Sequence, residues 1–213
     1  MTLKDENVHM QKNLNILLTL AIFLYLPFAS ADEPNLGLFV IMHDQLTQRE
    51  RAELKESYLP SLLAQLHDIT GRRTTVTFIK DEPGLTNFHY RGDNLEKLLY
   101  TLFQASIEYA NAKNLPRPSE RHKYVLVTSN KINGVTHGVA ATNYHVAVTS
   151  LKDDNTLAHE VGHLFGAEHE DATGFPCQTI MWGNASTSII PCHYFSKANK
   201  ALIRSYVAKL AVR

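Results

Sequence analysis

The sequence predicts an α+β fold with an α/β-like N-terminal part. We expect a twisted, mostly parallel five-stranded sheet with one antiparallel edge strand, two long helices, a third helix, and a small C-terminal subdomain ending in a helix. Strand and helix patterns alternate up to residue 128, which favours parallel strands joined by right-handed crossovers. Two closely spaced strand patterns follow at 135–142 and 144–150. They leave too little chain for a parallel crossover, so at least one strand runs antiparallel.

Three strand patterns lie in the N-terminal part, at 36–42, 74–79 and 124–128. The first is continuously apolar, as a strand covered on both faces would be. The second is rich in β-branched residues, which favour strands. These three strands should form the parallel part of the sheet.

Two long helices are expected between these strands. Thr47 and Glu50 form a capping box, in which the two residues satisfy unpaired amides at the helix start, and Gly71 ends this helix. Pro60 lies inside it and predicts a kink or a break into two helices. The second long helix covers about 95–110, and its apolar stripe should face the sheet.

Small residues follow in a segment that we expect to form the antiparallel edge strand. Its members are Gly138, Val139, Ala140 and Ala141. Their small side chains would let an extended peptide pair with the strand, although an ordinary edge strand would look the same. At the other end of the chain, Ser196 is expected to cap the last helix.

The chain carries the pattern H-E-x-x-H-x-x-G-x-x-H, beginning at His159. Residues four apart share a helix face, so His159 and His163 can direct two imidazoles at one point. Gly166 lets the chain leave the helix sharply, which would bring His169 back as a third ligand. Three protein ligands and an open fourth position are typical of a catalytic zinc site. Glu160 lies where a zinc metalloprotease needs its general base.

Two further features belong to the helix of this motif. Asp154 or Asn155 is expected to be its N-cap residue. Gly162 lies in its interior, where glycine destabilises a helix by about 1 kcal/mol relative to alanine. Gly162 is therefore either tolerated there or admits a close neighbour.

The first residues have the pattern of an export signal. Lys12 precedes an apolar run at 14–28, and an A-x-A cleavage pattern ends at Ala31, before Asp32. The run is shorter than the roughly 20 residues of a membrane-spanning helix. We therefore expect a signal peptide at 1–31 and a secreted or periplasmic product, with an uncleaved anchor as the alternative.

The mature chain would be a single domain at 32–213, with subdomains at about 32–166 and 167–213. The formal net charge is zero, which gives no electrostatic reason to expect nucleic acid or an anionic membrane as a partner. We expect a monomer without stable membrane insertion after cleavage. In an oxidising compartment, Cys177 and Cys192 should form one disulfide. Their alternative role as zinc ligands is less favoured, because the histidines already form a complete set.

The segment HEVGHLFGAEH and the later Met181 resemble the metzincin zinc endopeptidases. In metzincins a methionine turn lies beneath the metal, and Met181 is the matching position. Cys177 before Met181, and Phe195-Ser196 after it, make the C-terminal part most similar to the reprolysin (adamalysin) group. The resemblance implies a zincin fold, one catalytic Zn²⁺, a protein or peptide substrate, and Glu160 as the general base.

The close resemblance covers about 155–196, and it has departures. Glu170 follows the third histidine where reprolysins usually have aspartate, and the chain has two cysteines in all. By their position in the family, three residues could wall the pocket for the side chain that follows the cut, or could simply pack under the loop. They are Ile189, Ile190 and Pro191.

Other polar side chains could carry function, but an ordinary role is expected for each. His137, His145 and His193 are expected to be surface or satisfied core histidines, and packing is expected of Tyr194 rather than a place beside the metal. Calcium could bind three acidic residues, for which a solvated loop is the simpler interpretation. They are Asp81, Glu82 and Asp93.

Two other functions compete with the endopeptidase. One is an exported, zinc-stabilised binding domain without turnover, against which Glu160 argues, because a structural zinc site does not need that carboxylate. The other is a zinc amidase acting on cell-wall peptides, which Gly166 and Met181 disfavour. The endopeptidase is the function that the sequence predicts.

Overall fold

The computed structural model describes residues 35–183 and 190–210. The predicted signal peptide at 1–31 and Ile189 lie outside these residues. Within them, no helix combines the length and the apolar character that crossing a membrane requires.

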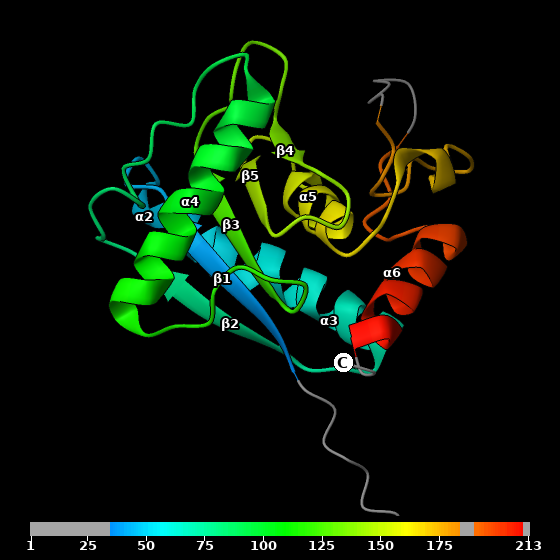
Figure 1. Ribbon diagram of the computed structural model, residues 1–213. Helices are drawn as coiled ribbons and strands as arrows, with labels where there is room; N and C mark the ends of the chain where they lie inside the picture. The colour runs from blue at the N-terminus through cyan, green and yellow to red at the C-terminus, as the bar shows by residue number, and fades with distance from the viewer. Residues whose placement is uncertain (1–34, 184–189, 211–213) are drawn as a thin grey trace, which may run out of the picture. The chain divides into compact units, whose positions relative to one another are not determined.

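The sheet has five strands in the order β2-β1-β3-β5-β4 (Figure 1). Four of them run parallel: β1 (Leu36–Met42), β2 (Thr74–Ile79), β3 (His122–Thr128) and β5 (Val146–Ser150). The edge strand β4 (Gly138–Ala140) is antiparallel to β5. The mixed sheet with one antiparallel edge strand is thus confirmed, and β4 ends one residue earlier than expected.

The described chain contains five α-helices. They are α2 (Gln48–Glu53), α3 (Leu59–Thr70), α4 (Leu95–Lys113), α5 (Thr156–Leu164) and α6 (Lys197–Lys209). A π-helical turn (Leu54–Tyr58) joins α2 to α3, and a 3₁₀ turn (His169–Asp171) follows α5.

The predicted break at Pro60 is a π-helical turn rather than an interruption. The capping box of Thr47 and Glu50 starts α2 as expected. The amide of Leu59 then donates to the carbonyl oxygen of Leu54, five residues back, and Pro60 follows in the first turn of α3. Proline has no amide to donate, and a first turn is where that donor is least needed. The wider turn lets the helical path continue through Pro60.

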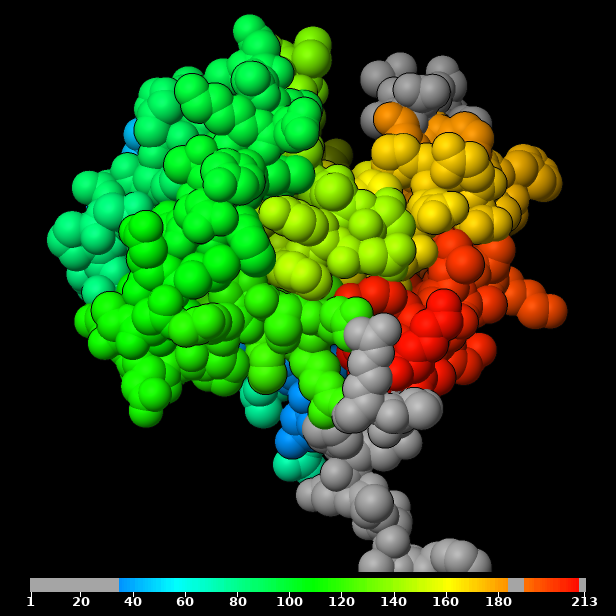
Figure 2. Space-filling model, viewed as in Figure 1, coloured from blue at the N-terminus to red at the C-terminus, as the bar shows by residue number. Residues whose placement is uncertain are grey.

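The sheet separates two cores. Helix α4 covers one face, and Figures 1 and 2 show it across the front of the sheet. Helices α3, α5 and α6 contribute to the core on the other face. Alternate residues of β1 serve the two sides: Phe39 and Ile41 pack in the α4 core, and Leu38 and Val40 pack in the other. All seven residues of β1 are buried, which explains its continuously apolar sequence.

A lysine lies inside the second core. Lys123 of β3 is fully buried, and its Nζ donates to the carbonyl oxygen of Tyr144 and to the hydroxyl of Tyr206, each at 2.8 Å. The rings of Phe165 and Tyr206 lie 5.4 and 4.9 Å from this nitrogen. Burial lowers the pKa of Lys123 to about 7, although Glu120 acts in the opposite direction. Lys123 therefore joins β3 to α6 and to the end of α5.

Candidate metal centre

Helix α5 carries the motif, and it begins after Asn155, one of the two predicted N-cap residues. Asn155 is the N-cap residue, but its side chain makes no capping bond. The carboxylate of Asp153 accepts from the amide of Asn155 at 3.0 Å instead. The Asn155 side chain contacts Cys192 and His193, and Asp154 accepts from a tyrosine hydroxyl. Tertiary partners thus compete with the local cap for these side chains.

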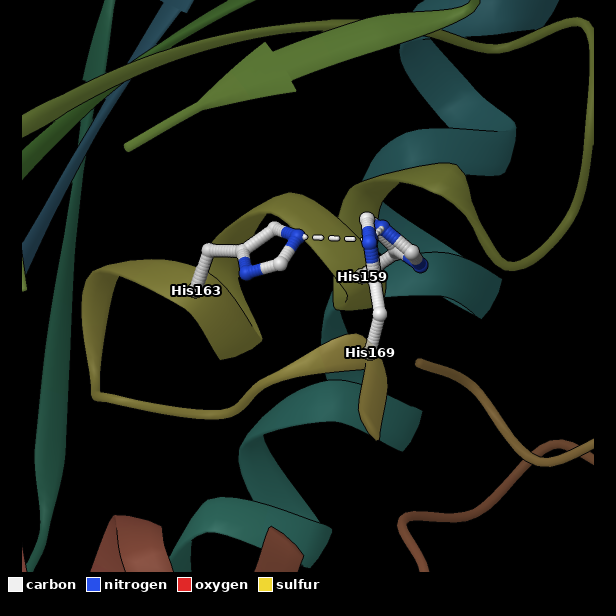
Figure 3. A group of neighbouring side chains, drawn as sticks. All are labelled: His159, His163 and His169. Atoms are coloured by element: carbon white, nitrogen blue, oxygen red, sulfur yellow. Dashed lines mark hydrogen bonds between the residues drawn. The ribbon is translucent and has the colours of Figure 1, made fainter. Parts of the chain in front are cut away.

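The three histidines of the motif converge at the end of α5 (Figure 3). His159 and His163 are one helical turn apart on α5. Gly166 has a φ of +89°, a backbone conformation that favours glycine, and the chain turns there towards His169. The Nε2 atom of His169 lies 2.9 Å from that of His159 and 3.0 Å from that of His163.

Hydrogen bonds fix the orientation of two imidazoles. Nδ1 of His159 donates to the carbonyl oxygen of Ile180 at 2.8 Å, and Nδ1 of His163 donates to that of Ala167 at 2.9 Å. Because a carbonyl oxygen only accepts, both rings carry their proton on Nδ1 and direct an Nε2 lone pair at the common point. Burial lowers the pKa of His159 to about 4 and also lowers the pKa of His163.

The donor set fits a single metal ion. Three nitrogens at 2.0–2.1 Å from one tetrahedral ion lie about 3.3 Å apart, close to the distances between the Nε2 atoms. Among the described residues, no other group of three or more His, Cys, Asp or Glu side chains has this potential. Neutral imidazoles with oriented lone pairs are suitable ligands for zinc.

Glu160 lies beside this point against the edge strand. Its side chain is 5% exposed, and burial raises the pKa of its carboxyl group. A Cβ atom on Gly138 would lie 2.6 Å from Oε1 and 2.7 Å from Cγ of Glu160. Because Gly138 has no Cβ atom, the carboxylate of Glu160 can occupy this space. This contact joins the predicted base to the strand predicted to bind peptide.

A cavity of about 340 Å³ opens at the site. Its lining includes His159, His169 and Glu160, together with His137 and Gly138 from the start of the edge strand. Another part of the lining comes from the chain after the 3₁₀ turn. Its members are Gln178, Thr179, Ile180, Trp182, Gly183 and Pro191. Sequence reasoning identified Pro191 in this wall but not Gln178 or Trp182, because no motif marks them.

Met181 lies beneath the helix, as its place in the motif implies. A Cβ atom on Gly162 would lie 2.8 Å from Sδ of Met181 and 2.7 Å from Cε1 of Phe195. Gly162 therefore admits close neighbours rather than being merely tolerated. The backbone carbonyl that orients His159 belongs to Ile180, the residue before Met181. The turn at Ile180 and Met181 thus both packs under α5 and orients the ring of His159.

The structure places Cys177 and Cys192 in a disulfide, with their Cα atoms 5.5 Å apart. The bridge encloses the segment that includes Met181 and part of the cavity wall. Ile190 is 78% exposed and is not among the cavity residues, so the predicted pocket wall is reduced to Pro191 within the described chain.

Of the other candidate residues, His137 lies at the cavity, and His193 and Tyr194 have other contacts. His137 lines the cavity, and its Nδ1 is buried without a partner, unlike a satisfied core histidine. His193 contacts Asn155, and the hydroxyl of Tyr194 lies 3.4 Å from Sγ of Cys177. The remaining candidates take no part in the cavity. His145 contacts Tyr144, Glu82 pairs with Lys113, and Asp93 accepts from Asn133.

Comparisons with known proteins support this geometry. The reprolysin-type model of metallo-peptidase family M12 matches residues 91–203. The crystal structure of metalloproteinase-II from Bacteroides fragilis has a similar fold, with a TM-score of 0.56 and 16% identity over 84% of this chain. The chain covers 55% of that protein, about half its length. None of the curated proteins matches the sequence. The chain belongs to metallo-peptidase family M12.

Proposed function

We propose that the chain is an exported zinc metalloendopeptidase in which Glu160 is the general base. The observation that carries this proposal is the convergence of three histidines, two of which line one cavity together with a buried carboxylate. His159, His163 and His169 would hold the ion. When bound, zinc increases the acidity of water and polarises a carbonyl oxygen.

The residues of the chain supply the rest of the mechanism. An extended peptide would pair antiparallel with the edge strand, along Gly138, Val139, Ala140 and Ala141. Glu160, held against Gly138, would accept a proton from the attacking water and deliver it to the leaving amine. The contact between Glu160 and Gly138 supports this arrangement, because it brings the base next to the strand that would position the scissile bond.

Export is part of the proposal and is supported by two features. The sequence before Asp32 has the pattern of a cleaved leader. The disulfide between Cys177 and Cys192 suits an oxidising compartment. The mature product would be a domain at 32–213 with subdomains meeting near residue 166. Mass spectrometry of the exported protein should find Asp32 at the N-terminus, and a retained leader would contradict this.

The experiment that tests the activity compares wild type with Glu160→Gln. The purified chain should contain about one zinc ion per molecule and should cleave a mixed peptide library. Loss of the carboxylate should lower kcat/KM by roughly 10²- to 10⁴-fold, the usual contribution of a general base, while the zinc content stays unchanged. Equal cleavage by both proteins would contradict the role of Glu160.

The same experiment separates the two rival functions. A zinc-loaded wild type that cleaves no peptide would favour a binding domain. Cleavage restricted to cell-wall peptides would favour the amidase. The carboxylate at Glu160 argues for turnover, because the three imidazoles alone suffice to hold a structural ion.

A further inference from the structure

The cavity beside the metal centre has a polar wall, and most of its polar groups are already paired. Asp153 accepts from the amide of Asn155 and lies 3.5 Å from the hydroxyl of Thr156. The side chain of Asn155 bonds to Cys192 and His193. These groups already have hydrogen-bond partners within the protein.

Two polar atoms in the same lining remain unpaired. Nε2 of Gln178 and Nδ1 of His137 are buried and have no hydrogen-bond partner. The Gln178 side chain is only 6% exposed. An unpaired buried donor or acceptor destabilises a protein, so a native structure rarely retains one without a role.

The backbone of Gln178 is held firmly. Its amide donates to the carbonyl oxygen of Ile190 at 3.1 Å, and its carbonyl accepts from the amide of Cys192 at 2.7 Å. The disulfide begins at the preceding residue, Cys177. His137 is fixed next to the edge strand, where its carbonyl oxygen accepts from the amide of Ser150 of β5. Both unpaired side chains therefore project from anchored backbone.

We propose that Gln178 and His137 are specificity residues that bind an uncharged carboxamide side chain of the peptide substrate, that of glutamine or asparagine. This inference rests on the proposed function and names its substrate class. The carboxamide oxygen would accept from Nε2 of Gln178, and the carboxamide nitrogen would donate to Nδ1 of His137.

Burial lowers the pKa of His137, which keeps its imidazole neutral and leaves one ring nitrogen as an acceptor. An apolar side chain would leave both protein atoms unpaired. A lysine or arginine side chain has no acceptor for Gln178. An acidic side chain would meet Asp153 and Glu160, and the described residues of the lining include no lysine or arginine to balance it. The carboxamide supplies both the acceptor and the donor, on two separate atoms of one side chain.

The test uses a peptide library varied on both sides of the cut, followed by matched peptides with Gln, Met, Glu, Lys or Ser at the selected position. Methionine is close to glutamine in size and lacks its polar atoms. Wild type should prefer Gln to Met by at least tenfold in kcat/KM, because sites that hydrogen-bond a substrate discriminate strongly against analogues without that group. In Gln178→Met the ratio should fall below about threefold, and in the control Gln104→Met it should persist.

Several results would overturn the inference. They are a wild type that selects no carboxamide at any position, one that prefers Ser, Glu or Lys there, and a preference that survives Gln178→Met. Thermal unfolding gives an independent criterion. Removing an unpaired buried atom should leave Tm unchanged or raise it, so a clear fall in Tm would assign Gln178 a structural role instead.

A binding measurement keeps this inference separate from the proposed function. Glu160→Gln should bind the Gln peptide at least tenfold more tightly than the Met peptide. If wild type cleaves nothing and this Kd ratio is near one, both proposals fail. If wild type cleaves the library without carboxamide preference, the endopeptidase proposal stands and the specificity proposal fails.

Discussion

Two ionisable side chains are buried in this fold, and their surroundings differ. Lys123 of β3 is fully enclosed, and two hydrogen bonds and two aromatic rings surround its nitrogen. Glu160 of α5 is 5% exposed, but it faces a cavity and rests against the backbone of Gly138. Burying either charge is unfavourable unless it is paired or neutralised.

The difference indicates how to distinguish a structural charge from a functional one. The partners of Lys123 come from three parts of the chain that it holds together, and it does not line the cavity described at the metal centre. Glu160 lines a cavity together with two of the three clustered histidines, His159 and His169. Replacing Lys123 should therefore change stability, and replacing the surroundings of Glu160 should change activity.

The largest effect is expected from Gly138→Ala. The new Cβ would lie 2.6 Å from Oε1 of Glu160, so the carboxylate must move away from its position. We expect kcat/KM to fall by about 100-fold or more, which corresponds to about 2.7 kcal/mol. Zinc content and Tm should change little. The control is Gly134→Ala, where a Cβ atom meets nothing within 4 Å. Wild-type activity in Gly138→Ala would show that the contact does not position the base.

The second effect is a change in the pH dependence of stability in Lys123→Met. The folded pKa of about 7 lies below the ordinary value of 10.5. Between these values the unfolded chain binds the additional proton, so the free energy of unfolding rises with pH, and this contribution is lost as pH falls through 7. Lys123→Met should remove a slope of up to about 1.4 kcal/mol per pH unit.

Urea unfolding at pH 7, 8 and 9 measures this slope. The exposed Lys80→Met serves as the control and should keep the wild-type slope. An unchanged slope in Lys123→Met would mean that another group produces it. Zinc content should stay at the wild-type level, because Lys123 does not line the cavity at the metal centre.

A third, smaller effect is expected from Gly162→Ala, which tests how α5 packs on the core beneath it. Gly162→Ala would place a Cβ atom 2.7 Å from the ring of Phe195 and 2.8 Å from Sδ of Met181. Overpacking of this kind destabilises a protein by about 1–3 kcal/mol, and the better helix propensity of alanine offsets about 1 kcal/mol of that. We expect a net loss of about 1 kcal/mol in urea unfolding. A stabilised variant would show that the core under α5 readily adjusts.

Local patterns in the sequence predicted much of this molecule. Alternating strand and helix patterns predicted the mixed sheet, and the capping box at Thr47 started a helix where expected. The approach of His159, His163 and His169 depends only on helical geometry and one sharp turn, so the sequence also predicted this cluster. These features share one property, since each is decided by residues close together in the chain.

The features that escaped prediction depend on residues far apart in the sequence. The contact of Gly138 with Glu160 requires the edge strand and α5 to be docked, and no local pattern encodes it. Lys123 stands directly before the predicted strand at 124–128, and its partner Tyr206 comes 83 positions later. Asn155 was expected to cap α5, but Cys192 and His193 engage its side chain. Tertiary packing decides such cases.

The last prediction tests how the hydrogen bonds of Lys123 stabilise the fold. Tyr206→Phe removes one hydrogen-bond acceptor from Nζ and should lower the free energy of unfolding at pH 9 by about 1 kcal/mol. At pH 6 Lys123 carries a charge, and hydrogen bonds to charged groups are stronger, so the loss should be larger there. Tyr100→Phe, on an exposed ring, is the control and should have no effect at either pH. Equal losses at pH 6 and pH 9 would show that the Tyr206 hydroxyl does not discriminate between the two states of Lys123.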